Sequence, residues 1–310
     1  MDGVKITLAD FERSHPLALF QAKNSYYEAE KKAIDASMDD YLLERQAKKE
    51  NLSVSALLEL HVNSQIAKDP SDESLKVYYE GLDTTESFEG MRDKIKDHLR
   101  ERRIGKAKDA YIQSLRKQAS VTVTVAPPRT SVSLANAQVR DHVENAPLTL
   151  VEYADYECPY CQQIAPDLAK IEAEYKGRIA FAYKDFPLPM HPHAQKAAEA
   201  AQCAGAQNRY WDYHDALLSS KQLEIPQLKA TASALGLDVT AFNTCLDSGQ
   251  GADQVKKNFN EGLELGITGT PSFVVNGRFI SGSLPYDQLR NLLEEELRSG
   301  QGPASRAALQ

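Results

Sequence analysis

The stretch L-T-L-V-E-Y-A-D-Y-E-C-P-Y-C at residues 148–161 decides the fold. Its apolar beginning, residues 148–153, predicts a strand, and Cys158-Pro159-Tyr160-Cys161 opens a predicted helix that runs to about residue 175. Pro159 suits the first turn, because an amide there needs no helical partner. A strand, a CxxC motif and a helix in this order indicate redox chemistry at the start of the helix.

The helix start favours a nucleophilic thiolate. Unpaired amides and the positive end of the helix dipole lower the pKa of a cysteine placed there. We therefore expect Cys158 to be an exposed thiolate that attacks a substrate disulfide or accepts a substrate thiol. Cys161, one turn further on and more buried, is expected to resolve the mixed disulfide.

A zinc site or a purely structural disulfide fits the CxxC motif less well. A zinc site needs two more ligands, typically from a second CxxC or an H-x₃-H motif, and the sequence offers neither. A disulfide between residues three apart rarely stabilises a fold. The sequence therefore predicts no metal and no cofactor.

A second motif lies downstream in G-I-T-G-T-P-S-F-V-V-N-G at residues 266–277. Pro271 heads a predicted strand, Asn276-Gly277 forms a hairpin turn, and residues 278–280 form the next strand. The Thr270-Pro271 bond is a candidate cis peptide, because the proline heads a strand and a CxxC motif lies upstream.

Two charged residues, Glu152 and Lys184, fall on predicted central strands, where an unpaired charge is costly. As a pair beneath the CxxC motif they could relay the proton of Cys161, since burial raises the pKa of a carboxyl. The alternative is an ion pair at the sheet edge without a catalytic role.

The other two cysteines, Cys203 and Cys245, lie on separate predicted helices. They form either a structural disulfide or two buried free thiols. An oxidising compartment favours the bridge.

The composition separates two halves. The chain has 310 residues and a formal net charge of −8, which argues against a general nucleic-acid binder. All four cysteines follow residue 130. The first half predicts helices at residues 17–50, 53–66, 70–80 and 87–119, then a strand at 121–125. Thr7 and Asp10 form a candidate helix cap.

The first half resembles the N-terminal domain of SurA-type periplasmic chaperones. The resemblance rests on V-K-I-T-L-A-D-F at 4–11, Y-L-L-E-R-Q-A-K-K-E-N-L-S-V at 41–54 and P-S-D-E-S-L-K-V-Y-Y-E at 70–80. It implies binding of unfolded polypeptide, although the parvulin domains of SurA have no counterpart here. The alternative is a helical domain whose charges form only its solvated face.

The second half resembles the DsbA-like branch of the thioredoxin superfamily. E-Y-A-D-Y-E-C-P-Y-C at 152–161, F-A-Y-K-D-F-P-L at 181–188, Y-W-D-Y-H-D-A-L-L at 210–218 and residues 266–277 carry the resemblance. It implies an α/β thioredoxin fold with a helical insertion at about 191–249, and thiol–disulfide exchange at Cys158 and Cys161. A Pro-Tyr dipeptide (Pro159-Tyr160) and a Thr before the cis proline occur in isomerases such as DsbG as well as in oxidases, so the direction stays open.

These observations predict a mainly α-helical SurA-like domain at 1–125, a linker at 126–147, a DsbA-like domain at 148–300 and a flexible tail at 301–310. The expected function is extracytoplasmic thiol–disulfide exchange on unfolded or reduced client proteins. A membrane or soluble redox partner would recharge the motif, and a homodimer is plausible. Met1-Asp2-Gly3 does not begin a secretory signal, so a periplasmic location implies a removed leader. The alternatives are a holdase chaperone that uses the thioredoxin fold as a scaffold, and a cytosolic reductase.

Overall fold

The computed structural model describes the chain except for residues 1–6, 8–9, 12–15, 67–68, 83, 120–124, 141–145 and 300–310. The predicted strand at 121–125 lies almost wholly outside the described residues, and the predicted tail at 301–310 lies entirely outside them. The chain divides into two compact units, one formed by residues 1–26 and 127–310 and the other by residues 27–126. Residues up to Tyr26 thus group with the second half, whereas the sequence predicted one domain over 1–125.

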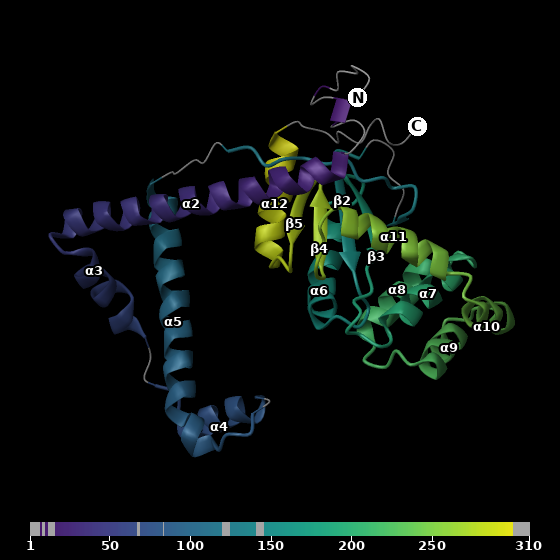
Figure 1. The fold of residues 1–310 in the computed structure, drawn as a ribbon, viewed down its shortest axis with the longest axis horizontal. Helices are drawn as coiled ribbons and strands as arrows, with labels where there is room; N and C mark the ends of the chain where they lie inside the picture. Colours follow the sequence, from purple (N-terminus) through teal and green to yellow (C-terminus); the bar gives the residue numbers. More distant parts are fainter. Residues whose placement is uncertain are drawn as a thin grey trace, which may run out of the picture. The chain divides into compact units, whose positions relative to one another are not determined.

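The first unit contains a five-stranded sheet in the order β1-β3-β2-β4-β5. Figure 1 labels the strands β2, β3, β4 and β5 of this sheet. Strands β2 and β3 are parallel, and the other three pairings are antiparallel. The strands are β1 (Gln138–Arg140), β2 (Leu148–Ala154), β3 (Ile179–Asp185), β4 (Ser272–Val275) and β5 (Arg278–Ser281). The helices are α6 (Pro159–Glu174), α7 (Ala194–Gly205), α8 (Tyr210–Ser219), α9 (Ile225–Ala234), α10 (Val239–Ser248), α11 (Ala252–Glu264) and α12 (Tyr286–Arg298).

Both faces of the sheet are covered by apolar cores. Because successive side chains of a strand point to opposite faces, β2 supplies Leu148 and Leu150 to one core, and Val151 and Tyr153 to the other. Helices α6 and α12 complete the first core. The sheet is therefore buried on both sides, which explains why every residue of β3 is buried.

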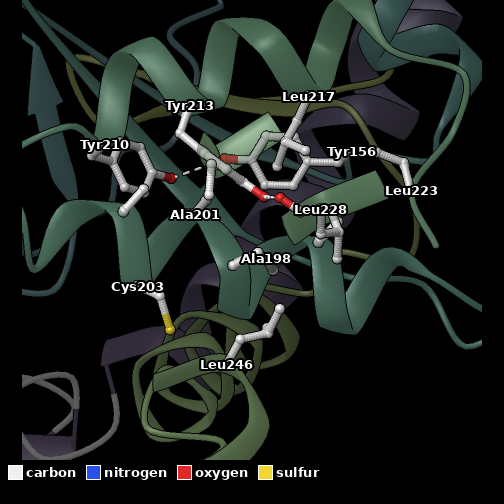
Figure 2. Packing of buried hydrophobic residues seen from close by; sticks show 14 of the residues in the cluster. Tyr156, Ala198, Ala201, Cys203, Tyr210, Tyr213, Leu217, Leu223, Leu228 and Leu246 are labelled. Atoms are coloured by element: carbon white, nitrogen blue, oxygen red, sulfur yellow. Dashed lines mark hydrogen bonds between the residues drawn. The ribbon is translucent and has the colours of Figure 1, made fainter. Parts of the chain in front are cut away.

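Helices α7 to α11 lie between β3 and β4 in the chain, and α7 to α10 build a helical core of their own (Figure 2). Helix α7 is rich in alanine, so neighbouring helices can approach it closely. A disulfide between Cys203 of α7 and Cys245 of α10 joins two of these helices across 42 residues.

The segment 126–147, predicted as a linker, is part of the sheet-containing unit. Its strand β1 pairs antiparallel with β3, and Thr130 N donates to Gly277 O at 2.8 Å. Arg129 forms an ion pair with the buried carboxylate of Glu296 at 2.7 Å. The linker prediction is therefore wrong. The strand has only three residues, too few for an alternating pattern to show, and it is specified by the open edge of β3.

The N-terminal half is helical, as predicted. It contains α2 (Pro16–Glu50), α3 (Val54–His61), a 3₁₀ turn (Asn63–Gln65), α4 (Asp72–Glu80) and α5 (Phe88–Ala119). The predicted helix at 53–66 is too long, because the α-helix ends at His61 with Val62 as its C-cap, and a 3₁₀ turn follows. Helices α2, α3 and α5 share a core that includes Leu43, Leu57 and Ile112. None of the helices in the described part of the chain has the length and apolar character that crossing a bilayer demands.

The N-terminal cap forms as predicted. Thr7 N donates to Asp10 Oδ2 at 2.9 Å, and Asp10 N donates to Thr7 Oγ1 at 3.1 Å. Further along, Phe20 is buried in the core beside Val151, and the Gln21 amide donates to the carbonyl of Glu264 at 2.5 Å. The beginning of α2 thus caps the end of α11, where carbonyls lack helical partners.

Removing the Cys203–Cys245 bridge should destabilise the helical core without changing the CxxC chemistry. Closing a loop of this length restricts the unfolded chain, so the double variant Cys203→Ser/Cys245→Ser should lose roughly 2–4 kcal/mol of unfolding free energy. Urea denaturation of both proteins measures the loss. Equal unfolding midpoints for the two proteins would contradict a stabilising role for the bridge.

Candidate active site

Cys158 occupies the N-cap of α6, with extended backbone angles of φ −71° and ψ 120°. Pro159 is the first helical residue, as the sequence predicted. Cys158 N donates to Asp155 O at 3.1 Å, and Gln162 N donates to Cys158 O at 3.1 Å. These bonds hold the cysteine where β2 passes into α6, with its sulfur at the amide end of the helix.

The Thr270-Pro271 peptide bond is cis and lies against Cys158. Cys158 Sγ lies 3.3 Å from Thr270 O, although the two residues are 112 positions apart. Pro271 directly precedes β4, which pairs with β2. The pairing of these two strands therefore brings the CxxC motif and the proline loop together.

The surroundings of Cys158 favour its thiolate. A hydrogen bond from the Cys161 side chain is the largest cause that lowers its pKa, and the Thr270 side chain and the amides of Tyr160 and Cys161 lower it further. Partial burial opposes them, and the resulting pKa is about 5. Cys158 is therefore ionised at neutral pH.

Cys161 has the opposite character. Burial is the main cause that raises its pKa well above the usual value, and the hydrogen bond to Cys158 and the charge of Glu152 add to it. Both cysteines are free thiols in this structure. The pair thus combines an acidic thiol at the cap with a protonated thiol one turn further on.

The expectation of an exposed Cys158 is wrong for this structure, since only 3% of the residue is accessible. The loop of Thr270 and Pro271 lies against its sulfur. Tyr160, between the two cysteines, is 61% exposed and is the large apolar side chain that the motif presents to solvent.

Glu152 and Lys184 do not form the predicted pair. Glu152 is in register with Tyr183, whereas Lys184 is in register with Tyr153, so the two charges point to opposite faces of the sheet. The Lys184 ammonium instead binds Glu261 of α11, with Nζ 2.7 and 2.6 Å from its two carboxylate oxygens. Sequence alone did not single out Glu261, because its pairing depends on how α11 packs on the sheet.

Glu152 itself lies on the face that α6 covers. It is fully buried, and burial is the main cause that raises its pKa to about 8, with the charge of Glu172 adding to it and that of Arg140 opposing it. Its Oε2 atom has no hydrogen-bond partner among the described residues. A carboxyl held in this way is protonated at neutral pH, and its charge, once it ionises, helps to raise the pKa of Cys161.

A clamp that the sequence did not predict holds the loop before Cys158. Asp155 Oδ1 accepts from Glu157 N at 2.8 Å, and Asp155 Oδ2 accepts from Leu188 N at 2.8 Å and contacts His191 Nδ1 at 2.7 Å. His193 N donates to Glu157 Oε2 at 2.7 Å. The sequence Met190-His191-Pro192-His193 was the one signal from which this clamp could have been predicted. Within the described ranges, no cluster of three potential metal ligands occurs.

Comparison with known proteins identifies the domain that contains this site. A sequence model of the thioredoxin family matches residues 143–295. The chain is 39% identical over 153 residues to the Na⁺/H⁺ antiporter NhaA 3 of Salinispora tropica. The aligned residues cover 48% of this chain and 23% of the antiporter. It is 33% identical over 162 residues to NhaA of Herminiimonas arsenicoxydans, 51% of this chain and 26% of that protein. The chain thus spans about a quarter of the length of these curated relatives.

Two solved structures are similar to this chain. BdbD from Bacillus subtilis superposes with a TM-score of 0.51 at 24% identity, covering 56% of this chain and all of BdbD. Wolbachia pipientis α-DsbA1 superposes with a TM-score of 0.49 at 23% identity, covering 54% of this chain and 94% of that protein. The similarity to BdbD is one of fold, and it agrees with the family match. Residues 143–295 therefore form a thioredoxin-like domain, preceded in the chain by a helical region.

Proposed function

We propose that this protein is a thiol–disulfide oxidoreductase that acts on unfolded or partly folded polypeptides outside the cytosol. The observation that carries the proposal is the asymmetry of the two thiols, since Cys158 is acidic and Cys161 is not. A cysteine pair used only for structure has no need of this difference. The adjacent cis proline supports the same role, because in thioredoxin folds the backbone of the residue beside this proline pairs with an extended substrate.

The reaction that follows from this geometry has two exchanges. A substrate thiolate attacks Cys158 Sγ of the oxidised pair, the Cys158–Cys161 bond breaks, and Cys161 leaves as a thiolate that takes the proton of Glu152. A second substrate thiolate then attacks the substrate sulfur of the mixed disulfide. Cys158 leaves as a stable thiolate, so the substrate is oxidised by two electrons and the CxxC pair is reduced.

The low pKa of Cys158 favours this oxidising direction. A stabilised thiolate lowers the free energy of the reduced pair, and a pair with a stable reduced form is a strong oxidant. A membrane-bound or soluble redox partner must then withdraw two electrons to restore the Cys158–Cys161 bond. The exchange needs no cofactor, because both electrons stay on sulfur throughout.

The Cys203–Cys245 disulfide supports a location in an oxidising compartment. Disulfides are rare in cytosolic proteins, where thiols are kept reduced. In such a compartment, newly exported polypeptides with reduced cysteines are the substrates that need an oxidant.

The helical region is proposed to hold these polypeptides. Three apolar side chains on different helices of residues 27–126 are more than half exposed: Tyr41 at 60%, Leu60 at 52% and Val77 at 67%. Exposed apolar side chains on a charged helical scaffold suit weak contact with unfolded chains. The competing function is a holdase chaperone in which the thioredoxin-like domain serves only as a scaffold.

The thiolate should be visible in a pH titration of the reduced protein. Absorbance at 240 nm should rise with a midpoint near pH 5, and Cys158→Ser should abolish the rise, because burial keeps Cys161 protonated. Cys161→Ala should move the midpoint upward, since it removes the largest cause of the low pKa. Cys161→Ser is the matched control. It keeps a hydroxyl donor, so it should shift the midpoint of the titration less than Cys161→Ala does. A midpoint above pH 8 in the unmodified protein would refute the acidic thiol.

Glu152→Gln should separate proton transfer from thiol acidity. The amide keeps the shape of the side chain but cannot exchange a proton, so departure of Cys161 from the Cys158–Cys161 disulfide, the step that forms the mixed disulfide, should slow by roughly 100-fold at pH 7. The Cys158 titration should stay near pH 5. Rapid-quench measurement of mixed-disulfide formation from the oxidised protein and a substrate thiol tests this, and an unchanged rate would remove Glu152 from the mechanism.

The same variant has a pH-dependent effect on stability. Because the folded protein raises the pKa of Glu152 above its unfolded value, ionisation opposes folding progressively from about pH 4.5 to 8. The stability gained in Glu152→Gln should therefore be small at pH 4 and reach several kcal/mol above pH 8. A gain that does not depend on pH would contradict the buried, unpaired carboxyl.

Client binding can be tested in the full chain. The triple variant Tyr41→Ser/Leu60→Ser/Val77→Ser should lose suppression of aggregation of a reduced, unfolded protein while exchanging disulfides with a small dithiol at the normal rate. Glu73→Gln, an exposed polar change in α4, serves as the control. If the unmodified protein suppresses aggregation but exchanges no faster than a free dithiol, the holdase function is favoured instead.

A further inference from the structure

Asp155 forms the turn that presents Cys158 at the start of α6. The turn follows directly on β2, which ends at Ala154. The backbone oxygen of Asp155 accepts from Cys158 N at 3.1 Å, and its Oδ1 atom accepts from Glu157 N at 2.8 Å. An aspartate that binds the amide two residues ahead stabilises such a turn with its own side chain. The position of the Cys158 sulfur therefore depends on the orientation of the Asp155 carboxylate.

The other carboxylate oxygen of Asp155 is held by the loop between β3 and α7. Asp155 Oδ2 accepts from Leu188 N at 2.8 Å and lies 2.7 Å from His191 Nδ1. His191 N in turn donates to Leu188 O at 3.0 Å, so a turn joins the two residues that bind this oxygen. Among the described contacts of the Asp155 carboxylate, two donors are backbone amides and His191 supplies the side-chain donor.

Burial makes these contacts of Asp155 necessary. The Asp155 side chain is 0% exposed, whereas that of His191 is 19% exposed. A buried carboxylate that loses a donor is costly, so removal of the imidazole favours a different orientation of the carboxylate. His191 therefore connects a partly exposed loop to the turn that places Cys158.

The imidazole of His191 can make this contact whether it is neutral or protonated. A carboxylate only accepts hydrogen bonds, so Nδ1 carries the proton that lies between His191 and Asp155. An imidazolium also carries a proton on Nδ1. The contact thus persists through the pH range in which Cys158 ionises, and titration of the thiol can reveal its effect.

The environment of the Cys158 sulfur depends on short distances. The sulfur lies 3.3 Å from Thr270 O. The hydrogen bond from the Cys161 side chain stabilises the Cys158 thiolate most, and the Thr270 side chain and the first amides of α6 add to it. Hydrogen bonds weaken steeply as their distances and angles depart from the preferred values. A turn that relaxes before α6 therefore weakens all of these contacts together.

We propose that His191 is a positioning residue of the active site, which orients Asp155 so that the turn before α6 places the Cys158 sulfur at the amide end of the helix and against the loop of Thr270 and Pro271. The proposal rests on the proposed thiol–disulfide exchange. His191 acts through Asp155 and takes no part in the transfer of electrons.

The experiment compares two substitutions that differ in where they place a donor. The amide nitrogen of His191→Asn stands at the same separation from Cα as Nδ1 and can donate to Asp155, whereas that of His191→Gln stands one bond further out. Both variants are studied in the full chain beside the unmodified protein. His193→Gln is the matched control on the same loop, because its backbone amide, which the substitution keeps, makes the contact with Glu157. Thermal unfolding shows whether each protein is folded.

The thiolate titration of the reduced protein, followed at 240 nm, is the first readout. In His191→Gln the midpoint should rise by about one pH unit from its value near pH 5, the shift expected when a hydrogen bond to a thiolate weakens. His191→Asn should restore most of the difference, and His193→Gln should keep the midpoint near pH 5.

Equilibration with glutathione is the second readout. Two glutathione molecules reduce the Cys158–Cys161 bond and leave as glutathione disulfide, so two electrons pass to the protein. A less stable Cys158 thiolate disfavours the reduced pair, so the equilibrium constant for this reduction at pH 7 should fall about tenfold in His191→Gln and recover in His191→Asn. A purely structural role of His191 would lower the unfolding temperature without this pattern.

A folded His191→Gln protein with the midpoint and equilibrium constant of the unmodified protein would overturn the proposal, and so would equal shifts in His191→Asn and His191→Gln. His191→Ala, which removes the donor altogether, replaces His191→Gln in the comparison should the latter not fold. If the unmodified protein oxidises no reduced, unfolded polypeptide, the proposed function fails, but the titration still decides the role of His191. The two failures are therefore distinguishable.

Discussion

The contact between the Cys158 sulfur and the loop of Thr270 and cis-Pro271 is the constraint on which the rest of the structure depends. It requires the N-terminus of α6 and the start of β4 to meet, and therefore requires β2 and β4 to be neighbours in the sheet. The clamp of Asp155 and Glu157 on the β3–α7 loop fixes the approach of β2 to α6. A displaced loop on either side would separate the sulfur from the groups that lower its pKa.

The sheet separates two kinds of buried charge. On one face, Lys184 is neutralised by Glu261, with hydrogen bonds that satisfy both groups. On the other, Glu152 forms no ion pair with any residue that the structure describes, and it faces the same side as the CxxC helix. A paired charge costs little to keep and does not readily exchange its proton, whereas the unpaired carboxyl is destabilising and able to exchange a proton. This difference identifies the face that carries Glu152 as the reactive one.

Much of this could be predicted from local patterns, because the chemistry is encoded in short motifs. The CxxC motif after an apolar strand, the proline heading β4 and the long uninterrupted helix from Pro16 to Glu50 are all visible in sequence. The partner of Lys184 could not be predicted from the sequence. A two-residue period indicates that residues 152 and 184 are on strands, but it does not give the register between the strands. Strand β1 was missed because three residues cannot show a pattern. The low accessibility of Cys158 depends on a loop 112 residues away, which no local signal reports.

The reduction potential of the Cys158–Cys161 pair, equilibrated against glutathione at pH 7, tests the oxidising role of the acidic thiol most directly. If the stabilised thiolate makes the pair an oxidant, the potential should lie nearer to about −120 mV than to about −270 mV, and Cys161 should be released readily by a substrate thiol. A potential near about −270 mV would contradict this role, because it would identify the pair as a reductant.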